Sequence, residues 1–369
     1  MRPRIVRIGG RLARAGKLVD GWLEVRGNRL SAVELGRAPR GAERQAGIIA
    51  PGLCDLQVNG AAGMNVTDGL RALDAIDAVQ LDHGITSYLP TVISTFEDEA
   101  ARVVAEIGDR VGDPRSPVAG IHLEGPFLNP RYRGVHRAEC LAAPTRGEPA
   151  YYGSPHVRLV TLAPELPGAL QLVSALTARG VTVSIGHTSA SADEAEQAAV
   201  HGAACVTHLF NAMKEFHHRR PNVPGWALAE SRVRVGVIAD GFHVDPLALR
   251  LVARLAGRRA VLVTDASPAA GADDGVYRMA GVEIHSEDGR VCDATGGLAG
   301  STLTLDEAVR RWTKFAGVSL AESLAAASER PARLVGLETG LRVGAPADLV
   351  VLTETGAVER VMRRGVWVR

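Results

Sequence analysis

Short apolar runs recur along the chain, and each one stops at polar residues or at Gly and Pro. Eight of these runs have the length and the β-branched content of buried strands. They span residues 48–60, 86–93, 118–126, 156–165, 181–188, 205–210, 233–241 and 260–266. Apolar patterns of helical period separate most of them, for example over residues 70–84, 97–110, 169–180 and 191–202. Strand and helix alternating over roughly 250 residues is typical of an α/β fold, the (β/α)8 TIM barrel.

Both ends of the chain follow a different pattern. Residues 5–14, 21–35 and 347–369 alternate between apolar and polar positions, as half-exposed antiparallel strands do. We therefore expect a small β-sandwich domain built from residues 1–50 together with 336–369, and a catalytic barrel over residues 51–335.

Composition and charge narrow the classes of partner. The chain has 369 residues, 46% of them hydrophobic, and a net charge of +1 from 42 basic and 41 acidic residues. A block of Lys and Arg of the kind that binds nucleic acid or anionic lipid does not stand out, so we expect a small-molecule partner, no nucleic acid and no membrane.

The cysteines and the apolar segments bear on the compartment. Cys54, Cys140, Cys205 and Cys292 are scattered without any C-x-x-C pair, so neither a zinc ribbon nor a disulfide framework is indicated. The N-terminus lacks a continuous apolar core, and no segment approaches about 18 uninterrupted apolar residues. We expect a cytoplasmic protein that is neither exported nor membrane-spanning.

Three residues that can bind a metal end three of the predicted strands. Glu124 lies in IHLEGP, His187 in SIGHTSA and His208 in THLFNAM. A single His in a strand is more often a hydrogen-bonded structural residue than a ligand. However, the active sites of (β/α)8 barrels gather at the carboxyl ends of the strands, and two His with one Glu form a familiar catalytic zinc set.

Asp265 ends the last predicted strand after four apolar residues, in VLVTDASPAAG. It could cap the turn that follows. We favour a role as general base, because a carboxylate beside a metal can take a proton from water and pass it to a leaving group.

Several longer motifs run through nearly the whole chain. They are PGLCDLQVNG, TSYLPT, HLEGPFLNPRYRGVH, GHTSAS, THLFNAM, HHRRP, IADGFHV, LVTDASPAAG and GGLAGSTLTLDEAVR. In these motifs the chain resembles the N-acetylglucosamine-6-phosphate deacetylases of the amidohydrolase superfamily. The resemblance implies a barrel with a small β-sandwich domain, usually as a homodimer. It also implies a hydrolase of amino-sugar metabolism that converts the acetamide of the sugar phosphate to acetate and the free amine.

The resemblance also implies roles for individual residues. The family's metal ligands match Glu124, His187 and His208, its catalytic acid/base matches Asp265, and its acetyl-carbonyl partner matches His136. Its substrate contacts match a larger set: Gln57, Val135, His136, Asn211, Ala212, Arg219, His243, Leu298, Ala299 and Gly300. We expect one divalent ion per chain, with zinc favoured and Fe, Co, Mn or Cd as alternatives.

The expectation of a single ion rests on the end of the first strand. Many amidohydrolases carry His-x-His there to hold a second metal, and the matching positions are Gln57 and Asn59. Amides are poor ligands for zinc. None of the three lysines, Lys17, Lys214 and Lys314, lies at a strand end where a carboxylated lysine could bridge two metals.

Alternative functions remain at this stage. The substrate could be another N-acetylated hexosamine phosphate, such as the galactosamine epimer. A cyclic-amide hydrolase is disfavoured by the missing His-x-His and lysine. A non-catalytic sugar-phosphate-binding barrel would be expected to lack Asp265 or a metal ligand. After Arg219 the chain reads Arg220-Pro221-Asn222 where the family commonly has Glu-Pro-Gly, and HHRRP could instead be a solvated basic loop.

Overall fold

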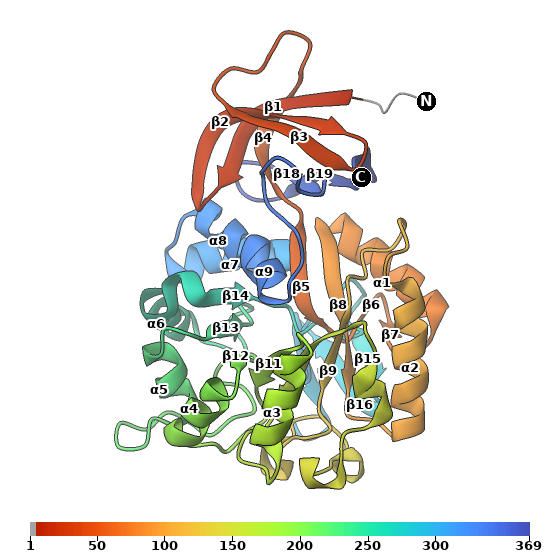
Figure 1. Ribbon diagram of the computed structural model, residues 1–369, viewed down its shortest axis with the longest axis vertical. Coiled ribbons are helices and arrows are strands. Elements are labelled where there is room, and N and C mark those ends of the chain that lie inside the picture. The colour runs from red at the N-terminus through yellow and green to blue at the C-terminus, as the bar shows by residue number, and fades with distance from the viewer. Residues whose placement is uncertain (1–4) are drawn as a thin grey trace.

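The structure is a computed structural model that describes residues 5–369, so the first four residues of the predicted N-terminal domain lie outside the described residues. Its centre is an eight-stranded parallel sheet with helices around it, and a separate sheet made from both ends of the chain lies above it (Figure 1). The predicted (β/α)8 barrel with a small β domain is therefore confirmed. The division at residues 50/51 and 335/336 stays a prediction.

The barrel strands follow one another in space in the order in which they occur in the sequence. They are β5 (Leu53–Val58), β8 (Ile85–Ile93), β9 (Ile121–Glu124), β10 (Val157–Leu162), β11 (Thr182–Ile185), β12 (Ala203–Val206), β13 (Arg234–Val237) and β14 (Ala260–Leu262). All eight predicted strands are present. They are buried and rich in Val, Ile and Leu, as expected for parallel strands that are covered on both faces.

The described residues form nine α-helices. They are α1 (Leu70–Asp82), α2 (Glu97–Arg110), α3 (Ala169–Ala178), α4 (Ala192–Val200), α5 (Asn222–Ala229), α6 (Pro246–Ala256), α7 (Leu305–Ala316), α8 (Leu320–Ala327) and α9 (Glu329–Leu334). Most of them lie around the barrel, and α7, α8 and α9 lie between the barrel and the small domain (Figure 1). Within residues 5–369, none of the helices is both long and apolar enough to cross a bilayer.

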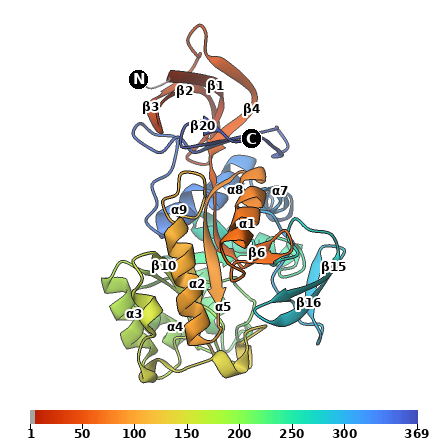
Figure 2. The same ribbon diagram turned by 90° about the vertical axis from the view of Figure 1, so that its right-hand side faces the viewer.

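The small domain is a seven-stranded sheet that carries its own apolar core. Its strands are β1 (Ile5–Arg14), β2 (Lys17–Arg26), β3 (Arg29–Leu35), β4 (Glu43–Pro51), β18 (Leu349–Leu352), β19 (Val358–Arg363) and β20 (Val366–Trp367). β18 pairs with β4, which joins the two ends of the chain, and Figure 2 shows the sheet curling above the barrel.

One part of the fold was not predicted. Between the last barrel strand and α7 the chain forms a three-stranded antiparallel sheet, β15 (Gly275–Met279), β16 (Val282–Glu287) and β17 (Arg290–Asp293). It projects from the side of the barrel in Figure 2. A short hairpin, β6 (Gly60–Ala61) with β7 (Met64–Asn65), follows the first barrel strand.

A buried carboxylate and backbone hydrogen bonds join the first barrel strand to the segment that follows the last one. Asp55 on β5 accepts a hydrogen bond of 2.6 Å from the hydroxyl of Thr264 and one of 3.3 Å from its backbone N–H. The backbone N–H groups of Asn59 and Gly60 add bonds to the carbonyl of Ala266. Burial raises the pKa of Asp55 to about 7, because its hydrogen bonds only partly offset the loss of water.

The raised pKa makes folding stability depend on pH at this position. The folded chain holds the Asp55 proton more tightly than the unfolded chain, so this stabilisation is fully present below about pH 4 and is lost as the pH rises through about 7. Asp55→Asn cannot ionise. Its unfolding free energy should therefore increase relative to the wild type by a few kcal/mol, on the order of 1.4 per pKa unit, between pH 4 and pH 8.

Urea denaturation at several pH values measures this difference. The matched control is Asp306→Asn, because hydrogen bonds and charges from His83 and Arg310 outweigh burial and lower the pKa of Asp306. For Asp306→Asn we expect the opposite trend: its unfolding free energy should fall furthest below that of the wild type at neutral pH. A constant difference between Asp55→Asn and the wild type at every pH would contradict the prediction.

Candidate metal and catalytic site

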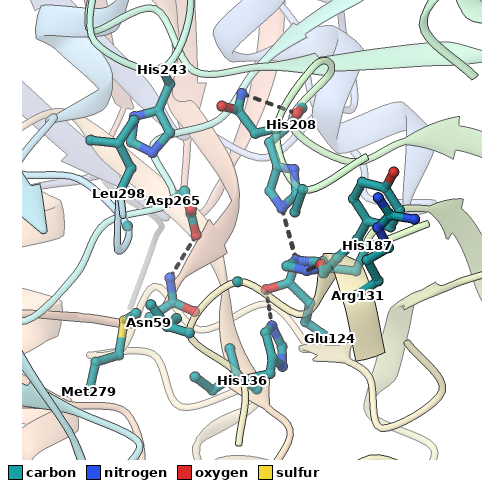
Figure 3. A pocket seen from close by; sticks show the side chains of 17 residues that line it. Asn59, Glu124, Arg131, His136, His187, His208, His243, Asp265, Met279 and Leu298 are labelled. Carbon is teal, nitrogen blue, oxygen red and sulfur yellow. Dashed lines mark hydrogen bonds and ion pairs between the residues drawn. The ribbon is translucent and has the colours of Figure 1, made fainter. Parts of the chain in front are cut away.

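A cavity of about 340 Å³ opens at the carboxyl ends of the barrel strands. Figure 3 shows polar side chains turned into it from several different strands and loops. Of the residues predicted to act on the metal or on the reacting bond, Glu124, His136, His187, His208 and Asp265 all line this one cavity. The structure therefore brings together residues that are up to 141 positions apart in the numbering, from 124 to 265.

Glu124 lies at the centre of the cluster, at the last position of β9. Its Oε1 is 3.3 Å from Nε2 of His187 and 3.3 Å from Nε2 of His208. The two imidazole nitrogens are 3.2 Å from each other. Three ligands bound at zinc distances in tetrahedral geometry lie about 3.3–3.4 Å apart, so these three atoms have the spacing of one face of a zinc coordination shell.

Hydrogen bonds to the rings indicate which nitrogens carry protons. Nδ1 of His187 lies 2.8 Å from the carbonyl of Tyr132, which can only accept, so Nδ1 carries the proton and Nε2 presents a lone pair. His136 has the opposite arrangement. The backbone N–H of Ser94 donates to its Nδ1 at 3.1 Å, so the ring proton is on Nε2.

This difference separates two sets of residues that could hold a metal. The ligating atoms of Glu124, His136 and His187 also lie within 4.8 Å of one another. However, Nε2 of His136 is 3.6 Å from Oε2 of Glu124, so its N–H faces that carboxylate. A protonated nitrogen is a hydrogen-bond donor and not a ligand, so Glu124, His187 and His208 form the set that fits a cation.

The electrostatics of the cluster favour a positive charge at its centre. Burial opposes ionisation of Glu124, but the charge and hydrogen bonds of the surrounding histidines outweigh it, and its pKa is well below the usual value. Burial also opposes protonation of His208, yet Glu124 and Asp265 raise its pKa. Burial lowers the pKa of His136 to about 4, so this ring is neutral at neutral pH.

Three of the site residues have a strained backbone. His187, His208 and Asp265 have φ angles of 48°, 25° and 51°, in the left-handed region that non-glycine residues rarely occupy. Such conformations cost on the order of 1–3 kcal/mol each and persist only where the surrounding structure holds them. All three follow barrel strands, where the chain turns sharply into the loop.

Asp265 is held by a residue that the sequence analysis considered only as a lost metal ligand. The amide Nδ2 of Asn59 donates to Oδ1 of Asp265 at 2.8 Å (Figure 3). Asp265 is half-buried, and desolvation together with the nearby charge of Glu124 raises its pKa. Gln57, the other amide, donates from Nε2 to Oε1 of Glu124 at 3.0 Å.

The structure also places the residues matched to substrate contacts. Seven of them line the cavity, namely His136, Val135, Asn211, Ala212, His243, Leu298 and Gly300. Gln57 donates to Glu124 without lining the cavity, and Ala299 is buried at 1% exposure. Arg219 is exposed in the turn between His217 and Arg220 and is not among the residues that line the cavity.

Some lining residues had not been assigned a role. Arg131 lies in the motif HLEGPFLNPRYRGVH and could have been singled out there, whereas Met279 comes from the unpredicted strand β15. Asp240, which follows β13, had no predicted role, and its Oδ2 lies 2.6 Å from Nδ1 of His243. That bond helps to keep the pKa of Asp240 below its usual value despite burial.

Comparison with known proteins identifies the family of this chain. Residues 48–368 match the model of the amidohydrolase family. The chain is 38% identical to the human N-acetylglucosamine-6-phosphate deacetylase over 97% of its length and 94% of that protein. It is 36% identical to an N-acetylgalactosamine-6-phosphate deacetylase of Escherichia coli O157:H7, over 88% of each chain.

The fold comparison agrees with the sequence comparison. A mutant N-acetyl-D-glucosamine-6-phosphate deacetylase from Mycobacterium smegmatis, solved in complex with N-acetyl-D-glucosamine-6-phosphate, superposes with a TM-score of 0.92. It is 35% identical, and the match covers 99% of each chain. The enzyme from Thermotoga maritima is 28% identical with a TM-score of 0.90.

The proton positions deduced for His136 can be measured. We expect ¹⁵N NMR of the labelled protein to show Nε2 protonated and Nδ1 bare, because Ser94 donates to Nδ1. The ring should also stay neutral at pH 5, since burial lowers its pKa to about 4. Comparison with His136→Asn assigns the signals. A proton on Nδ1, or a titration midpoint near the ordinary value of about 6.5, would contradict the prediction.

Proposed function

The chain belongs to the amidohydrolase family, and on that basis we propose that it hydrolyses the acetamide of N-acetyl-D-glucosamine 6-phosphate to D-glucosamine 6-phosphate and acetate. The observation that carries this proposal is the convergence of Glu124, His187 and His208 beside Asp265 in one cavity. The human and mycobacterial relatives named for this substrate support the assignment. The reaction belongs to amino-sugar catabolism and the recycling of cell-wall sugars.

We propose that Glu124, His187 and His208 hold one divalent ion, with zinc favoured and Fe, Co, Mn or Cd as alternatives. The spacing of the three donor atoms and the lone pair on Nε2 of His187 support this set. When bound, the ion would polarise the acetyl carbonyl and make water more acidic. Gln57 and Asn59, which stand where relatives with two metals carry histidines, bind neighbouring carboxylates instead.

The remaining residues move protons and stabilise charge. Asp265 takes a proton from the attacking water as its oxygen bonds to the acetyl carbon, and then gives that proton to the nitrogen as the C–N bond breaks. Its raised pKa favours holding the proton between the two steps. The Nε2–H of His136 donates to the acetyl oxygen while negative charge develops on it. Asn59 holds Asp265 in place throughout.

Substrate contacts complete the proposal. Val135, Asn211, Ala212, His243, Leu298 and Gly300 surround the sugar phosphate in the cavity. Gln57 supports the site through its hydrogen bond to Glu124, and Ala299 belongs to the same loop as Leu298 and Gly300. Arg219 stays a predicted phosphate contact.

A second candidate substrate is N-acetylgalactosamine 6-phosphate, which differs in the configuration of one hydroxyl. The E. coli relative named for that epimer is nearly as similar to this chain as the human enzyme, at 36% against 38% identity. A non-catalytic sugar-phosphate-binding barrel is disfavoured, because Asp265 and all three proposed ligands are present in one cavity.

We also propose a cytoplasmic homodimer. All four cysteines are unpaired, and three of them, Cys54, Cys140 and Cys205, are buried, as suits a reducing compartment. Leu247 and Leu251 of α6 are 64% and 49% exposed, and Phe216, in the loop before α5, is 57% exposed. Apolar side chains of this size on the surface support association with a second copy.

Acetate release from a panel of N-acetylated sugar phosphates tests the proposed function. We expect N-acetylglucosamine 6-phosphate to give the highest kcat/KM, with the galactosamine epimer and the unphosphorylated sugar as the comparisons. Faster turnover of the epimer would replace the first substrate by the second. Binding of the sugar phosphates without acetate release would support the non-catalytic barrel.

The ligand set can be tested by metal analysis. His187→Ala and His208→Ala should lose metal and activity together, because each removes one of three donors. His136→Gln should keep close to one ion per chain while its kcat falls, because His136 donates a hydrogen bond instead of ligating. Elemental analysis of the purified variants measures this. Loss of the ion from His136→Gln would place His136 among the ligands, and two ions in the wild type, both needed for activity, would contradict the single site.

The acid/base role can be tested separately. Asp265→Asn keeps the shape of the side chain but cannot accept a proton, so kcat should fall by roughly two to four orders of magnitude. Metal content and fold should persist in the same preparation, as elemental analysis and circular dichroism would report. A variant with nearly normal kcat would require another residue as the acid/base.

A further inference from the structure

Glu165 is a carboxylate at the rim of the barrel that does not line the cavity. It lies just beyond β10, is half-buried, and forms no ion pair within the described residues. Four hydrogen bonds from neutral donors converge on it instead. A carboxylate satisfied in this way can hold the segments that donate to it in a fixed position relative to one another.

The donors come from the two loops that carry the site. From the loop after β9, Nδ2 of Asn129 donates to Oε1 at 2.8 Å. From the loop after β11, the backbone N–H of Ser189 donates to Oε1 at 2.6 Å, and the hydroxyl of Thr188 donates to Oε2. Glu165 therefore joins the segment that begins at Asn129 to the segment that follows His187.

The same two loops are tied to each other at His187. The backbone N–H of Asn129 donates to the carbonyl of His187 at 2.9 Å, and the carbonyl of Tyr132 accepts from Nδ1 of the His187 ring at 2.8 Å. Thr188 continues the network, since its N–H donates to the carbonyl of Ala212 at 3.1 Å. The carbonyl of His187 is thus held by Asn129, which also donates to Glu165, while its ring is held by Tyr132 of the same loop as Asn129.

His187 needs such support because its φ of 48° is strained. If Glu165 were lost, Ser189 and Asn129 would lose a shared acceptor, and the loop could relax towards an ordinary backbone conformation. The Nε2 atom would then leave the position 3.3 Å from Glu124 and 3.2 Å from His208. Partners beyond the ligands commonly tune metal affinity in this way.

We propose that Glu165 is a positioning residue for the metal centre, which raises metal affinity by locking the two loops that hold His187. This inference rests on the proposed metal site but not on the identity of the substrate. Glu165 touches neither the cavity nor the ligating atoms, so its effect passes entirely through Asn129, Thr188 and Ser189.

Zinc affinity of the full-length protein, measured by competition with a chromogenic chelator, tests the proposal. Glu165→Ala should bind Zn²⁺ roughly 10- to 100-fold more weakly than the wild type. Glu165→Gln should be intermediate, because its amide oxygen can still accept from Ser189 while its NH₂ group cannot accept at all. Visible absorption of the Co²⁺-loaded proteins should shift in both variants if the geometry at His187 changes.

The matched control is Glu194→Ala. Glu194 also accepts hydrogen bonds only from neutral donors, the N–H and hydroxyl of Ser191, but these form the capping box of α4 and do not reach His187. This variant should lose thermal stability and keep its zinc affinity within about twofold of the wild type. If Glu165 contributed only to the stability of the fold, Glu165→Ala would give the same result as this control.

Several outcomes would overturn the proposal. One is a zinc affinity equal to that of the wild type in both Glu165 variants, and another is an equal loss of zinc affinity in Glu194→Ala. If Glu165→Ala does not fold, a wild-type zinc affinity in Glu165→Gln would overturn the proposal. Because zinc binding is measured without turnover, failure here would leave the proposed deacetylation intact. Conversely, if the wild type released no acetate while the wild type and variants showed the expected zinc affinities, only the proposed deacetylation would be contradicted.

Discussion

The site is organised by the crowding of three electron-rich atoms around one point. Oε1 of Glu124 and the Nε2 atoms of His187 and His208 lie 3.2–3.3 Å apart in a region almost closed to water. Lone pairs held this close repel one another unless a proton or a cation lies between them. The loops that bring them together must therefore be held by other forces, and much of the surrounding structure can be understood as supplying those forces.

The barrel supplies the first of them by fixing where each loop begins. Parallel strands with fully buried Val, Ile and Leu side chains are rigid, and their ends set the spacing of the residues that follow. Asp55 and Thr264 join the first strand to the last, so the rim closes and Asp265 comes to lie next to Asn59. Strain at His187, His208 and Asp265 is sustained because this frame cannot relax with them.

Much of this could be predicted from the sequence, because the signals are local. Alternating apolar strands and helical patterns identified the barrel, and polar residues at the strand ends identified Glu124, His187, His208 and Asp265. The sheet β15–β17 was missed because it lies outside the alternation of buried strands and helices that indicates the barrel, and its strands are partly exposed, with Val276 at 59% exposure. Met279 was missed with it.

Other features could not be predicted because they depend on contacts between distant segments. The state of an imidazole is set by its partner: Ser94, 42 positions away, leaves the ring proton of His136 on Nε2, while the carbonyl of Tyr132 holds that of His187 on Nδ1. The family resemblance assigns different roles to these two histidines, but the residue pattern does not show the partners that set their protons. Asn59 offers the same lesson, since an amide that is a poor zinc ligand donates instead to Asp265, the carboxylate that we propose as the acid/base. At such a site, the residues that orient the reacting groups determine the chemistry as much as the reacting groups themselves.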